Sequence, residues 1–391
     1  METKLFAFFV PGEENQVFPG SNLWEVPLSG KNKGDFCNIS SKNISKNQVI
    51  TIGDYFCAAR QFLSENDFLK LRSGLEIVFK RPVLTNQVER IIVFLEKHGA
   101  FYHPLKIQVM LNKNKSCSFV LNGAVSRSGL ALIENEFQLI SALNKTGSKH
   151  YLPNVFGIDV IKTDKGRIGF FLGEWFENYK EFHATEDRGK RQVVIWESNG
   201  SCHYISEVNA LPIYHEISRI LTYYYDIETF EQIFPWHQAA GDFIVRQEDE
   251  KVHVKLITVR GYSPLTEFSG QGENKIVHIL PALLFFFFNL TIRIRLDRLN
   301  GTGPSVMLGK KFLIPIVDGF LLALEEKTVL YDYGDIKFSF IDFLRQFNLE
   351  QIHDLMENVL ESCHLDASEF AVIKENLESH CKILHSIFKN V

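Results

Sequence analysis

The stretch PWHQAAGDFIVRQEDEKVHVKLITVRG, residues 235–261, carries the most specific pattern in the sequence. A short loop ends at Gly241, an apolar run follows, a charged segment comes next, and a second apolar run ends before Gly261. Two apolar runs around a polar turn are typical of a β-hairpin. We therefore predict a hairpin here, preceded by a loop that carries His237 and Asp242.

Two further hairpins and a helix are predicted upstream of this stretch. KIQVML and CSFVLNGAV flank a polar turn at 112–116, and NVFGIDVI and GRIGFFLGEWF flank another at 162–166. Between them, Ile133, Phe137 and Ile140 recur at helical spacing. The predicted order is two strands, a helix, then two strands.

The N-terminal part of the sequence has a different composition. Residues 1 to about 60 are rich in turn formers, and the short apolar runs between them suggest a small strand-containing module that continues into a helix near 61–72. VERIIVFLEKHG (88–99) is then predicted to form a helix that ends at Gly99.

Beyond Glu177 the pattern is mainly helical. The most apolar stretch, 279–292, is shorter than the roughly 20 residues of a membrane span, so we expect a buried helix. Arg293, Arg295 and Arg298 follow it, and we interpret them as a solvated helix face rather than an anion-binding patch.

Three more helices are predicted in this half. Residues 216–225 place apolar side chains on one face, and the last two helices are expected to begin near Asn348 and Asp366. Each of these two residues is followed three positions later by Gln or Glu, as in a capping box.

The bulk composition limits the function. The chain has 391 residues, 45% of them hydrophobic, and a formal net charge of -5. This charge gives no basis for wrapping a nucleic-acid backbone, and no segment is a clear membrane span. The six cysteines form no CxxC pair and indicate a reduced, cytoplasmic protein.

Position by position, the hairpin at 235–261 resembles the protein-kinase-like superfamily, which includes aminoglycoside and choline phosphotransferases. In that family a catalytic Asp stands five residues before a metal-binding Asn, and a second strand leads into a second metal-binding Asp. Here His237 stands at the catalytic Asp position, Asp242 at the Asn position and Thr258 at the second Asp position. The resemblance covers roughly residues 95–345.

The resemblance extends to the predicted strands and helix upstream. Asn122 stands where the family has its nucleotide-gripping lysine, and Glu136 matches that lysine's glutamate partner, with Glu134 as a second choice. Glu174 begins the segment that resembles the hinge between lobes. The segment expected to carry the phosphate-covering glycines contains only Gly99.

The resemblance implies an α+β, two-lobed, protein-kinase-like fold with an additional N-terminal strand-containing module. We expect that module at 1–90, a small lobe with an antiparallel sheet and one helix at 91–178, and a mainly helical large lobe at 179–391.

The substitutions weaken the chemistry that the resemblance implies. Asn122 carries no charge, and Thr258 offers a hydroxyl where Mg²⁺ needs a carboxylate. We expect a catalytically silent or weakly nucleotide-binding protein that acts as a regulatory or scaffold partner of an unknown protein. The alternative is an active phosphotransferase that uses ATP and Mg²⁺, with Asp242 as metal ligand and His237 as general base. A third possibility is an α+β fold unrelated to kinases.

Each candidate residue also has a structural interpretation. His237 in a Pro-Trp-His turn is at least as suited to bonding a backbone carbonyl as to catalysis, and Asp242 before a strand suits a turn cap. Glu136 suits a solvated helix position. The pairs Cys363–His364 and His380–Cys381 do not have the spacing of a zinc site.

Overall fold

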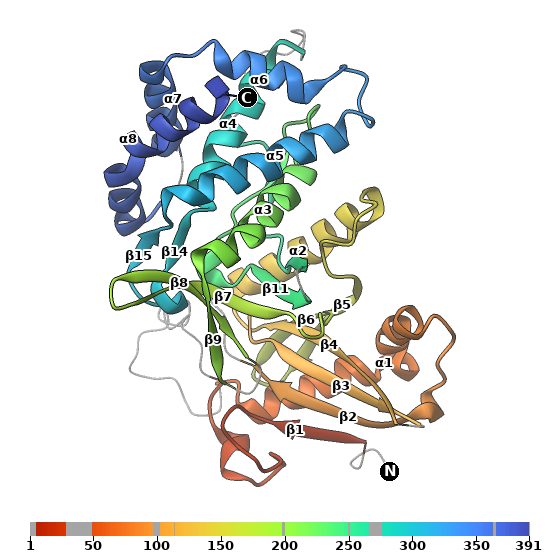
Figure 1. The fold of residues 1–391 in the computed structure, drawn as a ribbon. Coiled ribbons are helices and arrows are strands. Elements are labelled where there is room, and N and C mark those ends of the chain that lie inside the picture. Colours follow the sequence, from red (N-terminus) through yellow and green to blue (C-terminus); the bar gives the residue numbers. More distant parts are fainter. Residues whose placement is uncertain are drawn as a thin grey trace. The chain divides into compact units, whose positions relative to one another are not determined.

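The computed structural model describes residues 5–28, 49–96, 102–112, 114–197, 200–248, 251–265, 276–362 and 365–390. The chain divides into two compact units, Met1–Glu177 and Asn178–Val391. Each unit contains both helices and a sheet, so the protein belongs to the α+β class (Figure 1). The two units are described in turn.

The first unit is built on a six-stranded sheet. Its strand order is β1-β2-β3-β4-β6-β5. The pair β1–β2 is parallel, and all other neighbours are antiparallel. The strands are β1 (Phe6–Phe9), β2 (Val88–Leu95), β3 (Leu105–Leu111), β4 (Lys115–Ala124), β5 (Val155–Thr163) and β6 (Gly166–Glu174).

One helix covers each face of this sheet. Successive side chains of a strand point to opposite faces, so Phe170 and Phe171 of β6 face opposite ways. Phe170 packs in the core cluster with α1 (Ile52–Phe79), and Phe171 packs in a second cluster with α2 (Arg127–Thr146). The sheet is therefore buried on both sides in its β4–β6 region.

The segment 88–99 corrects one prediction. Val88–Leu95 forms strand β2, not a helix. Ile91, Val93 and Leu95 are buried in strict alternation, and the β-branched side chains favour the extended backbone that pairs with β1 and β3. The helix end predicted at Gly99 lies outside the described residues.

The segments expected as a separate module, 1–90, and as a small lobe, 91–178, share this one sheet. Strand β1 pairs with β2, and α1 packs on β5 and β6. The helix predicted near 61–72 lies within α1, whose backbone leaves helical geometry at Glu65–Phe68.

Several predicted elements of this unit are confirmed. The predicted hairpins form by antiparallel pairing of β3 with β4 and of β5 with β6. Helix α2 buries Ile133 and Ile140, as the helical spacing indicated.

The second unit contains a five-stranded antiparallel sheet, ordered β12-β11-β7-β8-β9. The predicted hairpin at 235–261 forms β11 (Phe243–Glu248) and β12 (Lys251–Leu256). A mainly helical region was expected beyond Glu177, but β7 (Lys180–Asp187), β8 (Lys190–Trp196) and β9 (Cys202–Ser206) come first. Buried polar side chains in β7, among them His183 and Thr185, interrupt the apolar alternation that would have indicated a strand.

The remaining elements of this unit are helices and two small hairpins. Helix α3 packs most extensively on α5, and it contains most of the helix predicted at 216–225. The helices are α3 (Glu207–Tyr223), α4 (Ile276–Arg293), α5 (Leu313–Lys327), α6 (Ile336–Arg345), α7 (Leu349–Ser362) and α8 (Ala367–Asn390), and the small hairpins pair β10 (Gln232–Ile233) with β13 (Tyr262–Ser263) and β14 (Leu296–Arg298) with β15 (Ser305–Met307). Across the chain, short 3-10 helices lie at Asn22–Glu25, Thr85–Gln87, Gln238–Ala240, Leu299–Gly301 and Lys310–Phe312.

Helix α4 is the apolar helix predicted at 279–292. Among the described residues it alone has the length and composition to cross a membrane, but 67% of it is buried within the protein. This burial fits the core helix of a soluble protein.

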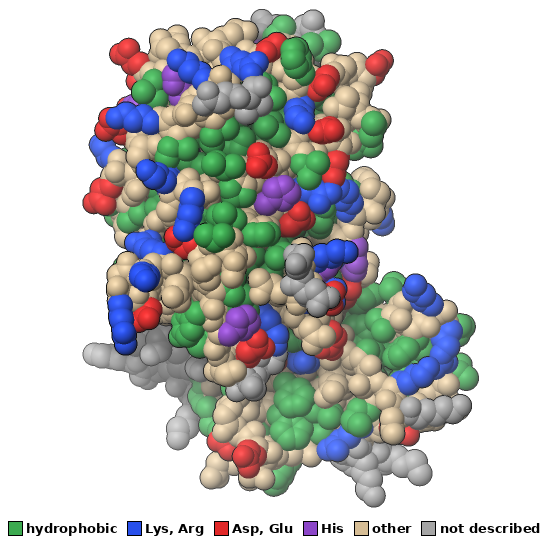
Figure 2. Space-filling model, viewed as in Figure 1, with side chains coloured by type: hydrophobic (Ala, Val, Ile, Leu, Met, Phe, Trp, Pro, Cys, Tyr) green, Lys and Arg blue, Asp and Glu red, His purple; other side chains and the backbone are tan. Residues whose placement is uncertain are grey.

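The face of the molecule in Figure 2 shows acidic and basic side chains interspersed with apolar areas.

The arginines after α4 correct another prediction. Arg293 and Arg295 are only 6% and 2% exposed, so they do not form a solvated face. Arg295 donates through Nε and Nη2 to the carbonyl of Leu308, and its Nη1 lies 2.7 Å from Nδ1 of the buried His380. Only Arg298 of the three reaches the surface, where it pairs with Asp366.

Both predicted capping boxes are confirmed. Asn348 accepts from the backbone N–H of Gln351, whose side chain accepts from the N–H of Asn348. Asp366 and Glu369 exchange the same two kinds of bond at the start of α8. The carboxamide and carboxylate groups thus occupy backbone donors that a helix start leaves unpaired.

Candidate functional site

The loop before β11 brings the predicted residues of the second unit together. Gln238–Ala240 form one turn of 3-10 helix, and Gly241 ends it with φ of +71°. That left-handed conformation suits glycine, which has no Cβ to clash with the following carbonyl. The turn places Asp242 at the start of β11, beside the end of β12.

Asp242 is a buried carboxylate, and both of its oxygens accept hydrogen bonds from protein donors. It is 1% exposed. Its Oδ2 accepts from the backbone N–H of His237 at 2.7 Å and from Nη1 of Arg260 at 2.6 Å, while Oδ1 accepts from Nη2 of Arg260 at 2.5 Å. Asp242 therefore caps the loop and holds a guanidinium in a two-bonded geometry.

The ring of His237 also has protein neighbours at both nitrogens. Nδ1 accepts from the backbone N–H of Ala239 at 2.9 Å, and Nε2 lies 2.8 Å from Oε1 of Glu369 at the start of α8. The close approach of His237 holds the pKa of Glu369 below its usual value, against the opposing effect of burial. His237 thus ties its loop to α8. The structural interpretation expected a bond to a backbone carbonyl, whereas Nδ1 accepts from a backbone N–H and Nε2 faces a carboxylate.

Thr258 follows β12 and is half-buried. It lies two residues before Arg260, and the backbone N–H of the preceding Ile257 donates to the carbonyl of Asp242 at 2.9 Å. The end of the hairpin therefore brings Arg260, rather than an acidic side chain, to the carboxylate of Asp242. The sequence interpretation did not foresee this pairing.

The other predicted residues belong to the first unit. Asn122 is half-buried in β4, opposite Phe171 of β6. Glu136 of α2 is 1% exposed, not solvated, and accepts from the hydroxyl of Tyr102 at 2.5 Å. The burial of Glu136 rules out the interpretation of this residue as a solvated helix position.

Glu174 anchors the end of β6. Its Oε2 accepts from the backbone N–H of Asn154 at 3.0 Å and from its side-chain amide at 2.8 Å, and it lies 2.7 Å from Nε2 of His150. Burial alone would raise the pKa of Glu174, but the bonds from His150 and Asn154 hold it below its usual value. Glu174 is therefore an ionised carboxylate that fixes the loop before β5.

A buried histidine between two carboxylates lies in the same unit as Asp242, and it was not predicted from the sequence. Nδ1 of His183 lies 3.2 Å from Oδ1 of Asp297, and Nε2 lies 2.8 Å from Oε1 of Glu181. Burial opposes the charged imidazolium, but the two carboxylates outweigh it and raise the pKa of His183 to about 9. His183 is thus a cation at neutral pH.

Both carboxylate oxygens of Asp297 have hydrogen-bonding partners within the protein. Asp297 is 1% exposed and accepts from the backbone N–H groups of Ala184 and Arg298, both at 2.7 Å, besides facing His183. Glu181 contributes the exposed end of this network, with 44% of its side chain accessible. The network joins β7 to β14, and its charges are balanced mainly within the protein.

The sequence matches no protein-family model. It also matches no curated protein. The contacts of Asp242 and His237 therefore carry the functional argument.

Proposed function

We propose that the chain is a kinase-like protein without phosphotransferase activity, and that it acts as a regulatory or scaffold partner of another protein. The observation that carries this proposal is the pairing of Asp242 with Arg260. Asp242 occupies the position that the kinase resemblance assigns to a metal ligand, and an internal cation takes both of its oxygens.

A guanidinium at this position opposes Mg²⁺ binding. Mg²⁺ requires oxygen ligands at about 2.0–2.1 Å in near-ideal octahedral geometry. To bind Asp242, Mg²⁺ would have to displace Arg260 or bind beside it. Two positive charges held within a few ångströms of each other in a buried site repel strongly. In phosphoryl transfer a metal ion bridges the phosphates and neutralises their charge. Here the positive charge beside Asp242 is the guanidinium of Arg260, which cannot bridge phosphates as Mg²⁺ does.

The contacts of His237 support the same conclusion. A general base needs a lone pair that reaches the substrate hydroxyl. Nδ1 of His237 uses its lone pair on the N–H of Ala239, and Nε2 faces Glu369. Proton transfer through this ring would require the loss of at least one of these contacts.

Surface composition supports a role in protein binding. Val329 and Leu330, in the loop after α5, are 86% and 66% exposed, and Phe338 on α6 is 60% exposed. A protein partner that bound over these side chains would remove their apolar surface from water. The free cysteines Cys57 and Cys202 are accessible or half-buried thiols, as suits the reducing conditions of the cytoplasm.

The test is thermal unfolding of the full chain with ATP, in the presence of Mg²⁺ and in the presence of a chelator. We expect no magnesium-dependent rise in the unfolding midpoint. A ligand at 100 times its Kd would stabilise the protein by about 2.7 kcal/mol, a shift that such a measurement detects easily.

Two variants make the test specific. Asp242→Asn removes the candidate ligand, and Asp342→Asn, on the exposed side of α6, is a matched control. Each variant is compared with its own midpoint in the absence of nucleotide. A magnesium-dependent stabilisation of the wild-type protein that Asp242→Asn abolishes, and Asp342→Asn does not, would overturn the proposal in favour of an active phosphotransferase.

A further inference from the structure

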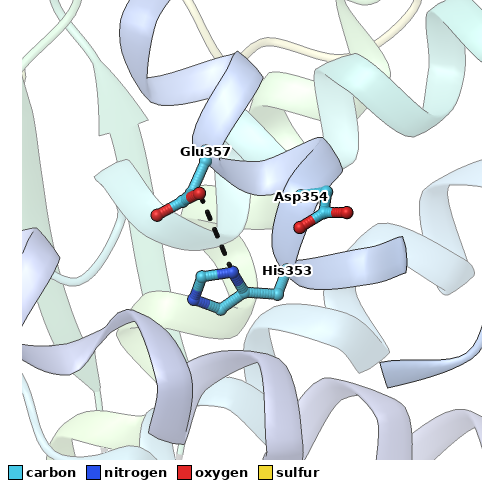
Figure 3. A group of neighbouring side chains, drawn as sticks. All are labelled: His353, Asp354 and Glu357. Carbon is cyan, nitrogen blue, oxygen red and sulfur yellow. Dashed lines mark ion pairs between the residues drawn. The ribbon is translucent and has the colours of Figure 1, made fainter. Parts of the chain in front are cut away.

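Helix α7 carries a group of metal-ligating side chains that is unrelated to the Asp242 site. His353, Asp354 and Glu357 lie within about one helical turn (Figure 3). One ligand atom from each lies within 4.8 Å of the other two, and Nδ1 of His353 is 4.0 Å from Oε2 of Glu357. Residues four apart share a helix face, which explains why His353 and Glu357 meet.

Carboxylates outnumber basic side chains around this group, where the nearby Lys382 pairs with Glu378. Glu350 lies one turn before Asp354 on α7, and no Lys or Arg in the described part of the chain forms an ion pair with Glu350, Asp354 or Glu357. Carboxylates at i and i+4 on a helix destabilise it by mutual repulsion. A bound cation would remove that repulsion.

A cavity of about 330 Å³ opens beside His353. Glu350 of α7 and Glu378 and Lys382 of α8 line it, together with the buried Cys381, and Lys382 pairs with Glu378. The Cys381 thiol is buried and donates to Sδ of Met356 at 3.4 Å, and it is not one of the three clustered side chains. The donors on offer are thus one imidazole nitrogen and several carboxylate oxygens.

The imidazole decides which cations suit this donor set. Carboxylates alone suit Mg²⁺ and Ca²⁺, whereas imidazole suits Zn²⁺ and its transition-metal neighbours. Two donors of a tetrahedral zinc site, each about 2.0–2.2 Å from the metal, lie roughly 3.4 Å apart. Small rotations of the half-exposed side chains of His353 and Glu357 would bring their 4.0 Å separation to that value.

We propose that His353, Asp354 and Glu357 form a solvent-accessible binding site for a divalent transition-metal ion of the Zn²⁺ or Co²⁺ type, with water completing the coordination shell. A metal ion that bridges His353 and Glu357 links successive turns of α7, and it therefore stabilises the helical part of the second unit. The proposal does not depend on the presence or absence of kinase chemistry.

The experiment uses the full chain, stripped of metal with a chelator. Zn²⁺ is titrated by calorimetry, and Co²⁺ is titrated by its visible absorption, whose intensity reports the coordination number. We expect one site with a nitrogen and oxygen donor set. Mutation of a residue that only hydrogen-bonds to a metal ligand typically lowers metal affinity 10–100-fold. Loss of a ligand itself should cost at least as much, so His353→Ala and Glu357→Gln should each weaken Zn²⁺ binding at least 10-fold.

A matched control separates this site from other histidines. His385 lies half-exposed on α8, and His385→Ala should bind Zn²⁺ as the wild-type protein does. Circular dichroism without metal should show unchanged unfolding for all three variants, because none of these side chains is in the core. Wild-type affinity in His353→Ala, or no wild-type binding even at about 1 mM Zn²⁺, would overturn the proposal.

Discussion

Arg260 and Asp242 meet through two parallel hydrogen bonds, 2.6 Å from Nη1 to Oδ2 and 2.5 Å from Nη2 to Oδ1. Asp242 is 1% exposed, whereas 21% of the Arg260 side chain remains accessible. The carboxylate has therefore lost nearly all its hydration and depends on Arg260 and on the N–H of His237 for compensation.

Removal of either partner of this pair should destabilise the fold. Breaking a buried ion pair typically costs 3–5 kcal/mol, because the remaining charge is left unpaired. Since Arg260 can reach water, we expect Asp242→Ala to cost about 3 kcal/mol of the free energy of unfolding, and Arg260→Met, which strands the carboxylate, to cost at least as much. Urea unfolding measures both.

The double variant Asp242→Ala with Arg260→Met is the control for that prediction. Replacing both charges by apolar groups leaves no unpaired charge, so the cost should be well below the sum of the two single substitutions. Strictly additive costs would show that the two side chains do not interact in solution.

His183 should make the stability of the protein depend on pH. Its folded pKa of about 9 lies above the unfolded value of about 6.5, so its contribution is complete below pH 6.5 and is lost as pH rises through 9. The shift corresponds to about 3 kcal/mol. Asp297 and Glu181 are the groups that face the ring, and burial raises the pKa of the nearby Tyr214.

Two measurements check the His183 prediction. Proton NMR of the His183 ring should show a titration midpoint near the folded value, and urea unfolding should show stability falling between neutral and alkaline pH. His203, which is exposed and pairs with Glu197, supplies the control, because His203→Gln should leave the pH profile unchanged. A His183 midpoint below pH 7 would contradict the prediction.

Lys327 should have the opposite effect on pH dependence. Burial lowers its pKa to about 8, while its Nζ donates to the carbonyl of Tyr223 at 2.8 Å. The unfolded chain binds this proton up to pH ~10.5, so stability rises with pH between 8 and 10.5. Relative to Lys327→Met, the wild-type protein should gain about 2 kcal/mol between pH 8 and pH 10. A constant difference between the two proteins would refute this.

Part of the fold could be predicted from the sequence because local patterns determine it. The three hairpins have apolar runs that end at polar turns, and the capping residues Asn348 and Asp366 act on backbone groups three residues away. Strand β2 was mistaken for a helix because its identity depends on pairing with β1, from a distant part of the chain. Whether the fold is kinase-like stays a prediction.

The candidate site was less predictable because its chemistry depends on partners that are remote in sequence. Spacing placed His237, Asp242 and Thr258 near one hairpin, but it could not show that Glu369 of α8 would meet His237. The pairing with Arg260 had a usable signal, since the register of β11 and β12 brings the residues after β12 beside Asp242. The spacing of His353 and Glu357 is a similar signal that was available in the sequence.

The close contact of α3 with α5 should be intolerant of a side chain at Gly319. A Cβ atom there would lie 2.2 Å from the backbone carbonyl oxygen of His215 and 3.3 Å from the backbone nitrogen of Arg219. These are backbone atoms of a helix, so they cannot rotate away, and α3 and α5 would have to separate. Although alanine favours a helix over glycine by up to about 1 kcal/mol, overpacking costs about 1–3 kcal/mol or more.

Gly319→Ala should therefore lower the free energy of unfolding despite its better helix propensity, with the loss measured by urea or thermal unfolding. Asp318→Ala, at the neighbouring exposed position of α5, is the matched control, because it gains helix propensity without any steric conflict. A Gly319→Ala protein as stable as Asp318→Ala would mean that α3 and α5 pack less closely in solution than their backbone separation here implies.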